Sequence, residues 1–196
     1  SSTQAGSPEF AYGSLTTGHM TDWQSTANFI RNVLPSSATI ASWWDYGYWI
    51  NSAGGGRTIV DNATFNSTQI ALMGYALMAL NLTESLKTFH LRNASHVLVY
   101  WGHRNSGVGG DDGKWPWMVR IAEDQLGSAL IDDRTYLNDD PSTPDNVETE
   151  WTTDAFFRST LYKLMLYGEP ANKDEGTAAG LSNARIYMDS FFNNPT

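Results

Sequence analysis

Stretches with helical spacing alternate with short apolar runs along this sequence, and this alternation constrains the fold more than any other feature. The apolar runs predict strands at Thr39–Trp43, Thr58–Val60 and His96–Trp101. Helices are predicted at Thr21–Leu34, Ser67–Leu80, Lys114–Leu126 and Thr149–Leu166, and a further strand-like segment at Ala184–Tyr187. Strands separated by helices indicate a mixed, helix-rich α/β fold with a small central sheet flanked by helices.

The connections between these segments carry ordinary start, stop and loop signals. Thr21 or Asp22 is the predicted cap of the first helix, and Pro35 follows its end. Gly102–Gly110 is predicted to be a loop, and Asp132–Asp145 an acidic loop. The acidic loop has enough carboxylate oxygens for calcium but lacks the ligand spacing of an EF-hand, so we expect a solvated loop.

Size and charge limit the classes of function. A chain of 196 residues with 41% hydrophobic content suits one main globular unit with its own core. Its 12 basic and 21 acidic residues give a net charge of −9, which disfavours nucleic acid or an anionic membrane surface as a partner. Cysteine is absent from the sequence, which leaves the redox compartment open. The longest apolar stretch, Ile70–Leu80, is shorter than the ~18 residues of a membrane span.

The first 20 residues resemble remnants of a cloning site and a tag. Gly6–Phe10 and Gly18–Met20 are typical of such leaders, and residues 1–20 show no periodicity. We therefore expect one domain over residues 21–196. Its abrupt start inside a predicted helix is what a fragment of a longer protein would show.

Trp43-Trp44-Asp45-Tyr46-Gly47 is the most unusual local composition in the chain. It falls at the end of a predicted strand, where binding sites collect in α/β folds. The indoles of Trp43 and Trp44 offer apolar walls and N–H donors, and Asp45 offers an acceptor, which together suit a serine or threonine hydroxyl. The alternative is that both tryptophans are core residues and Asp45 caps the following helical turn.

Asp111, Lys114 and Met118 form a second constellation, with spacings that place an acid, a base and a thioether on one helix face. Pro116 is tolerated best in a first helical turn, so the helix is predicted to begin near Lys114 and to leave Asp111 just before it. The alternative is an N-terminal charge, a solvated lysine and a buried methionine.

Together the two motifs resemble those of the oligosaccharyltransferase catalytic subunit, the STT3/AglB/PglB family of membrane enzymes. The motif Trp43–Gly47 matches the family's WWDYG signature in full, and Asp111-x-x-Lys114-x-x-x-Met118 is similar to its DxxKxxx(M/I) motif. Residues 61–68 also resemble the segment that follows WWDYG in this family. The resemblance covers about Thr21–Leu130.

The resemblance implies a role for each motif residue. Trp43, Trp44 and Asp45 would hold the +2 Ser/Thr hydroxyl of an Asn-X-Ser/Thr acceptor, with Tyr46 and Gly47 as motif support. A further set would complete the pocket, with Met118 against the threonine methyl, Lys114 in the same site and Asp111 positioning Lys114.

The resemblance also implies what this chain lacks. Catalytic carboxylates and their divalent metal, Mn or Mg, belong to a transmembrane half, so we expect no catalytic residue, cofactor or metal here and no transferase activity from the chain alone. The expected fold is the soluble C-terminal, central-core-type domain of a short archaeal AglB. Its partners would be an acceptor polypeptide and, through the transmembrane half, a lipid-linked (dolichyl phosphate or diphosphate) oligosaccharide, at the extracellular face of the cell membrane.

A carbohydrate-binding module or glycosidase-like extracellular domain is the rival interpretation. Eight tryptophans and excess carboxylates suit sugar stacking, and Asp45 with Asp61 or Asp111 are formal hydrolytic pairs. Four sequons, at Asn62, Asn66, Asn81 and Asn93, are compatible with the glycosylating side of a membrane. The irregular spacing of His90, His96 and His103 does not suggest a zinc site.

Overall fold

A computed structural model of the chain describes residues 17–100, 110–138 and 151–168. The first half contains α1 (Thr17–Asn32), β1 (Thr39–Ala41), the 3₁₀ turn η2 (Trp44–Tyr46), the π-helical turn η3 (Trp49–Ala53), β2 (Arg57–Thr58), α2 (Ser67–Met78), α3 (Leu82–Leu91) and β3 (His96–Val97). The second half contains α4 (Asp111–Leu126), η4 (Asp133–Thr135), β4 (Leu137–Asn138), β5 (Trp151–Thr152), α5 (Asp154–Arg158) and α6 (Thr160–Gly168).

The central sheet has the strand order β2-β1-β3, and both strand pairs are parallel. Ile40 of β1 lies opposite Thr58 on one side and His96 on the other. The strand Thr39–Ala41 is buried, as a middle strand of a parallel sheet must be. The prediction of a small central sheet within a helix-rich fold is therefore confirmed.

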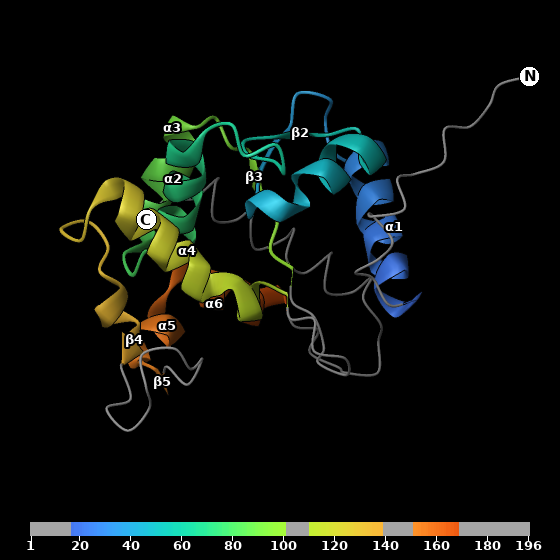
Figure 1. Cartoon of the computed structure of the whole chain (residues 1–196). Helices are drawn as coiled ribbons and strands as arrows, with labels where there is room; N and C mark the ends of the chain where they lie inside the picture. The colour runs from blue at the N-terminus through green and yellow to red at the C-terminus, as the bar shows by residue number, and fades with distance from the viewer. Residues whose placement is uncertain (1–16, 101–109, 139–150, 169–196) are drawn as a thin grey trace, which may run out of the picture.

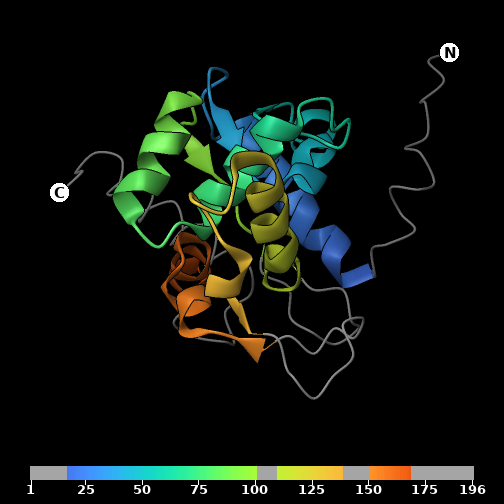
Figure 2. The same ribbon diagram turned by 60° about the vertical axis from the view of Figure 1, so that its left-hand side comes forward.

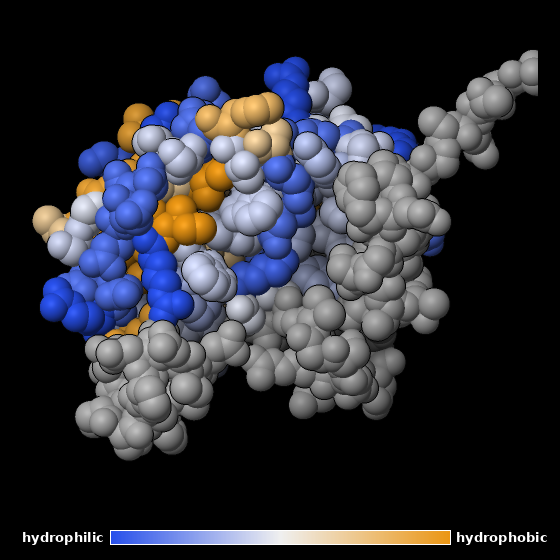
Figure 3. Space-filling model, viewed as in Figure 1, coloured by the Kyte–Doolittle hydropathy of each residue, from blue (hydrophilic) through white to orange (hydrophobic). Residues whose placement is uncertain are grey.

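Helices lie on both sides of this sheet (Figures 1 and 2). On one side α1 packs with η3, and on the other α2 packs along α4 and beside α3. Gly74 permits the close approach of α2 to α4, because a Cβ there would lie 2.6 Å from the Met118 carbonyl oxygen. On the face shown in Figure 3, hydrophobic groups lie among hydrophilic ones, and the buried core joins residues of the sheet and of the helices on both of its sides.

The first helix begins earlier than predicted. Helix α1 starts at Thr17, within the stretch assigned to a leader, so Thr21 or Asp22 is not its cap. Its apolar residues Trp23 and Ile30 are buried in the core as the helical spacing indicated.

Helix α4 also begins before the predicted residue. It starts at Asp111, and Pro116 lies inside it. The first turn is anchored from outside the helix, because the Asp111 N–H donates to the Tyr100 oxygen at 2.7 Å and its carboxylate accepts from the Tyr100 N–H at 2.8 Å. These two bonds stabilise a turn that propensity alone would leave outside the helix.

The predicted helix Thr149–Leu166 is wrong, because the chain forms β5, α5 and α6 in succession. Ser159 has an extended backbone (φ −63°, ψ 156°), and its hydroxyl accepts from the Tyr162 N–H at 3.1 Å. Thr160 donates its N–H to the Ala79 oxygen at 3.0 Å. Hydrogen bonds to a distant segment thus replace those of a continuous helix.

Part of the predicted acidic loop is ordered secondary structure. Its first residues form η4 and β4, and β4 pairs antiparallel with β5. The remaining residues of that loop, the predicted loop Gly102–Gly110 except its last residue, and the predicted strand Ala184–Tyr187 lie outside the described residues. Along the described ranges, none of the helices has the length and apolar character needed to cross a lipid bilayer.

Candidate functional site

The segment Trp43–Gly47 turns sharply at the end of β1. Trp43 is still extended, and η2 begins at the next residue. Gly47 is required by close backbone packing, because a Cβ there would lie 2.4 Å from the Asp61 Cα and 2.6 Å from the Val60 oxygen. The turn is therefore pressed against the segment that follows β2.

The aromatic residues of this turn divide between the core and the surface. Trp43 and Tyr46 are buried, with 2% and 5% of their surface exposed. Tyr46 packs against Trp23 and Tyr100, with ring centroids 5.3 and 5.9 Å away. Trp44 is only partly buried and lies at 6.3 Å from the Trp43 ring. The core interpretation thus describes Trp43 but not Trp44, which remains accessible, and Tyr46 is a core residue as well.

Lys114 joins the two sequence motifs in space. It pairs with the Asp45 carboxylate through Oδ2, although 69 residues separate them. Its Nζ also donates to the Tyr46 hydroxyl at 3.2 Å and lies 4.4 Å from the Tyr46 ring centroid. The Lys114 and Asp45 side chains are 29% and 25% exposed, so this pair lies at the surface of the site.

Asp111 lies beneath this pair and is fully buried. Burial raises the pKa of its carboxyl to about 7. The hydrogen bonds from the Tyr100 N–H and the Tyr46 hydroxyl and the charge of the Lys114 ammonium lower this pKa, but they do not offset the effect of burial. The burial of Tyr46 itself, together with the charges of Asp111 and Asp45, raises the pKa of the Tyr46 phenol. Asp111 therefore fixes the start of α4 through Tyr100 and shares its surroundings with Lys114.

Two carboxylate oxygens in this group are buried and have no hydrogen-bond partner in the described part of the chain. They are Asp45 Oδ1 and Asp111 Oδ1. An unpaired buried acceptor costs on the order of 1 to 3 kcal/mol, so a donor from a ligand would stabilise it. The Asp45 side chain as a whole is 25% exposed, but its Oδ1 is buried, so a ligand donor would reach this oxygen only after neighbouring groups moved.

Met118 lies deeper than its predicted role requires. Its side chain is fully buried, and its backbone lies against Gly74 where α2 and α4 meet. A ligand methyl could touch it only after neighbouring side chains moved. Of the predicted residues, the structure brings Trp44, Asp45 and Lys114 to an accessible place, and Trp43, Tyr46, Asp111 and Met118 behind them.

Asn62 belongs to this site although its side chain was assigned no role in it from the sequence. Its Oδ1 accepts from the Tyr48 N–H at 3.1 Å, and its Nδ2 donates to the backbone carbonyl oxygen of Asp45 at 3.1 Å. The only sequence signal was its place in the segment 61–68, which resembles the family's stretch after WWDYG. The other sequon asparagines, Asn66, Asn81 and Asn93, are exposed.

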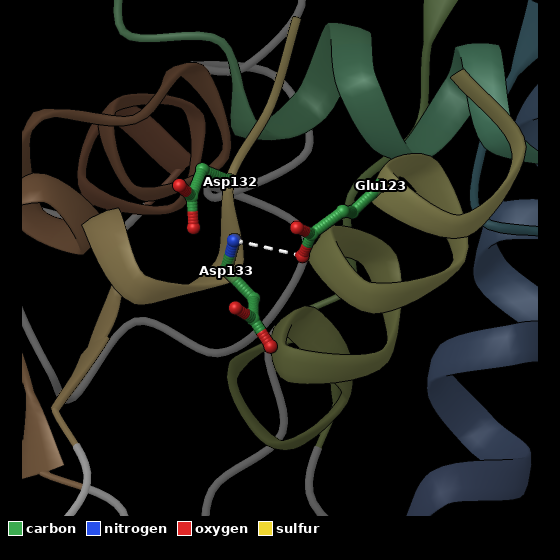
Figure 4. Close-up of side chains that lie close together, drawn as sticks. All are labelled: Glu123, Asp132 and Asp133. Atoms are coloured by element: carbon green, nitrogen blue, oxygen red, sulfur yellow. Dashed lines mark hydrogen bonds between the residues drawn. The ribbon is translucent and has the colours of Figure 1, made fainter. Parts of the chain in front are cut away.

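A separate acidic cluster lies between α4 and η4 (Figure 4). Glu123, Asp132 and Asp133 each bring a carboxylate oxygen within 4.8 Å of the others. Glu123 already accepts the Asp133 N–H at 3.0 Å, and Arg134 forms an ion pair with Asp132 at 3.0 Å. Arg134 lowers the pKa of Asp132 through this pairing. These contacts hold the start of η4 against α4, which explains why the three carboxylates lie close together.

Comparison with known proteins places these features in a family, although no family model matches the chain. It is 38% identical over 100 residues to the STT3B subunit of the dolichyl-diphosphooligosaccharide–protein glycosyltransferase of Oryza sativa, covering 51% of this chain and 14% of the relative. It is 33% identical over 147 residues to the STT3 subunit of Saccharomyces cerevisiae, covering 74% and 19%. It is 28% identical over 171 residues to the stt-3 subunit of Caenorhabditis elegans, and this match covers 86% of this chain and 22% of the relative.

A structural similarity accompanies these matches. The C-terminal globular domain of an oligosaccharyltransferase from Archaeoglobus fulgidus has a TM-score of 0.47 and 20% identity, over 78% of this chain and 83% of that domain. The chain spans 14 to 22% of the length of the three curated relatives above. From the sequence matches to those subunits, the chain belongs to the STT3/AglB family of oligosaccharyltransferase subunits.

Proposed function

We propose that this chain is the acceptor-recognition, C-terminal domain of a membrane oligosaccharyltransferase. That enzyme transfers glycan from a dolichyl-linked donor to the asparagine of an Asn-X-Ser/Thr sequon. The observation that carries the proposal is the contact of the two motifs, in which Lys114 holds Asp45 through one carboxylate oxygen and leaves the other unpaired.

The chemistry of a hydroxyl suits this arrangement. A serine or threonine O–H would donate to Asp45 Oδ1, and its oxygen would accept from the Lys114 ammonium or the Trp44 indole N–H. Lys114 lies beside Asp45, so donor and acceptor are offered side by side. A ligand with a methyl group in place of the hydroxyl would leave Asp45 Oδ1 unpaired.

The glycan-transfer chemistry belongs elsewhere in the enzyme. The divalent metal, Mn or Mg, and the carboxylates that bind it are assigned to a transmembrane half, and the lipid-linked oligosaccharide would bind there. Asp45 then serves recognition and is no catalytic acid. Such a domain would lie at the extracellular face of the membrane, and the purified chain alone would show no transfer.

The glycosidase alternative has less support. Asp61 Oδ1 accepts the Ala63 N–H at 2.9 Å within its own turn, and Asp111 has 0% of its surface exposed. Burial keeps Asp111 from facing a glycosidic bond across the 5 to 9.5 Å, roughly, that hydrolysis requires, and one oxygen of Asp61 is already engaged within its own turn.

Photocrosslinking tests the proposal. An Asn-Val-Thr peptide with a diazirine at its middle residue is compared with Asn-Val-Val, in which threonine is replaced by its isostere. We expect roughly tenfold more crosslinking with threonine, mapped near Trp44 and Lys114, and loss of this preference in Lys114→Met. Lys87→Met, on the exposed face of α3, is the control and should retain the preference. Equal crosslinking of both peptides, or crosslinks only at distant residues, would overturn the proposal.

A further inference from the structure

The side chain of Asn62 bridges two backbone groups of the site turn. Its amide oxygen accepts from the N–H of Tyr48, and its amide nitrogen donates to the carbonyl oxygen of Asp45, each at 3.1 Å. The two groups flank Tyr46 and Gly47, so one side chain spans the second half of the turn. Asn62 is partly buried, and its bond to Asp45 is partly shielded from water, whereas its bond to the Tyr48 N–H is exposed.

The segment that carries Asn62 is itself a tight turn. The Thr64 N–H donates to the Asp61 oxygen at 3.2 Å, and the Ala63 N–H donates to Asp61 Oδ1 at 2.9 Å. Thr64 adopts a positive φ of 54°, which closes the turn. The backbone of Asp61 also lies against Gly47, at a distance that no Cβ could fit. Asn62 is therefore held on a firm base opposite the site.

Only asparagine satisfies both groups at this distance. Alanine would leave the Tyr48 N–H and the Asp45 oxygen without these partners. Aspartate has the same shape and could still accept from Tyr48, but it would bring a second oxygen against the Asp45 oxygen, where a donor is needed. Asn62→Asp therefore replaces one hydrogen bond with two acceptors facing each other, with almost no change in volume.

We infer that Asn62 is a positioning residue of the hydroxyl-binding site, which fixes the backbone of Asp45 so that its carboxylate faces Lys114. This inference rests on the proposed function for its ligand, but its geometry is independent of the ligand. Asn62 touches no acceptor itself and acts through Asp45. The specificity for a hydroxyl at the +2 position would therefore depend on a residue from the segment after β2.

The test compares two variants that each lose one side-chain hydrogen bond to a backbone carbonyl oxygen. Asn62→Asp disturbs the site turn, and Ser85→Ala removes the bond from Ser85 Oγ to the Ala76 oxygen, 2.6 Å long and in the interface of α2 and α3. For each folded variant, two quantities are measured. One is the ratio of crosslinking to the Asn-Val-Thr and Asn-Val-Val peptides, and the other is the exchange rate of the Tyr48 amide hydrogen by NMR.

We expect Asn62→Asp to lower the threonine preference roughly tenfold. We also expect it to speed Tyr48 exchange, because the repulsion at the Asp45 carbonyl oxygen would loosen the turn that holds the Tyr48 N–H. Ser85→Ala should keep the wild-type values of both, since it lies away from the turn. An unchanged preference and unchanged Tyr48 exchange in Asn62→Asp would overturn the inference, as would equal changes in Ser85→Ala.

The same measurements separate this inference from the proposed function. If the wild-type chain shows no threonine preference, the proposed function fails and the Tyr48 exchange rate alone decides the inference. Faster exchange only in Asn62→Asp then supports the positioning role, and equal exchange in both variants refutes it. If the wild type prefers threonine and Asn62→Asp retains that preference, only the positioning role fails.

Discussion

The buried carboxyl group of Asp111 is expected to make the stability of this domain fall as pH rises. Its pKa is raised from 3.8 to about 7 in the folded chain, so between these values the folded state binds a proton that the unfolded state has released. The free energy of unfolding must therefore decrease with pH across this window and level off above about pH 7. Each pH unit between the two pKa values contributes about 1.36 kcal/mol. The two units from about pH 5 to about pH 7 therefore remove about 2.7 kcal/mol, and the further rise to about pH 8 removes almost nothing more.

Asp111→Asn isolates this contribution. Asparagine keeps an oxygen that can accept the Tyr100 N–H, but it carries no charge at any pH. Urea denaturation followed by tryptophan fluorescence gives the free energy of unfolding for both proteins at each pH. We expect the variant to gain about 2.7 kcal/mol relative to the wild type between about pH 5 and pH 8.

The control is Asp124→Asn, which changes an exposed carboxylate on the same helix. Its stability curve should run parallel to that of the wild type, because Asp124 is exposed and Asp111 is fully buried. A difference between Asp111→Asn and the wild type that stays constant across this pH range would refute the reasoning. It would mean that Asp111 remains charged in the folded chain, with Lys114 and Tyr46 offsetting the cost of its burial.

Two other predictions concern packing and modification. Gly74→Ala is expected to lower the free energy of unfolding by about 1 to 3 kcal/mol, because its methyl group would meet the Met118 carbonyl oxygen. Gly113→Ala lies in open space on α4 and should be neutral or stabilising. Equal losses of stability in thermal denaturation of the two variants would contradict this. In a glycosylating host, mass spectrometry should find glycan at the exposed Asn81, where only Oδ1 is engaged, in capping α3. It should find none at Asn62, because its Nδ2 donates to the Asp45 carbonyl oxygen. A glycosylated Asn62 in the folded chain would contradict this.

The central sheet was predictable because its strands are signalled by local composition. The apolar run at Thr39–Trp43 and the change to polar and aromatic residues after it predict both β1 and the turn at its end. The convergence of Asp45 and Lys114 did not follow from spacing, since 69 residues separate them. It was expected only from the resemblance of the two motifs to one family.

The parts that could not be predicted depend on hydrogen bonds between distant segments. Helical spacing extends through Ser159, but the Thr160 N–H bonds to Ala79 and the helix breaks there. Pro116 indicates a later start for α4, but the bonds of Asp111 to Tyr100 secure an earlier one. In each case a tertiary contact stabilises a backbone conformation that local propensity disfavours.

The two interpretations of the WWDYG turn are compatible because they apply to different residues of it. Trp43 and Tyr46 are buried, and Gly47 lies against the backbone of Asp61, so these three residues fix where the turn lies. Trp44 and Asp45 are partly exposed on the same turn. A carboxylate that selects a hydroxyl must be held within a few tenths of an ångström, and a surface turn alone would not hold it. Under the proposed function, the buried aromatic residues would serve recognition indirectly by holding this turn, and replacing any of them should weaken ligand discrimination and stability together.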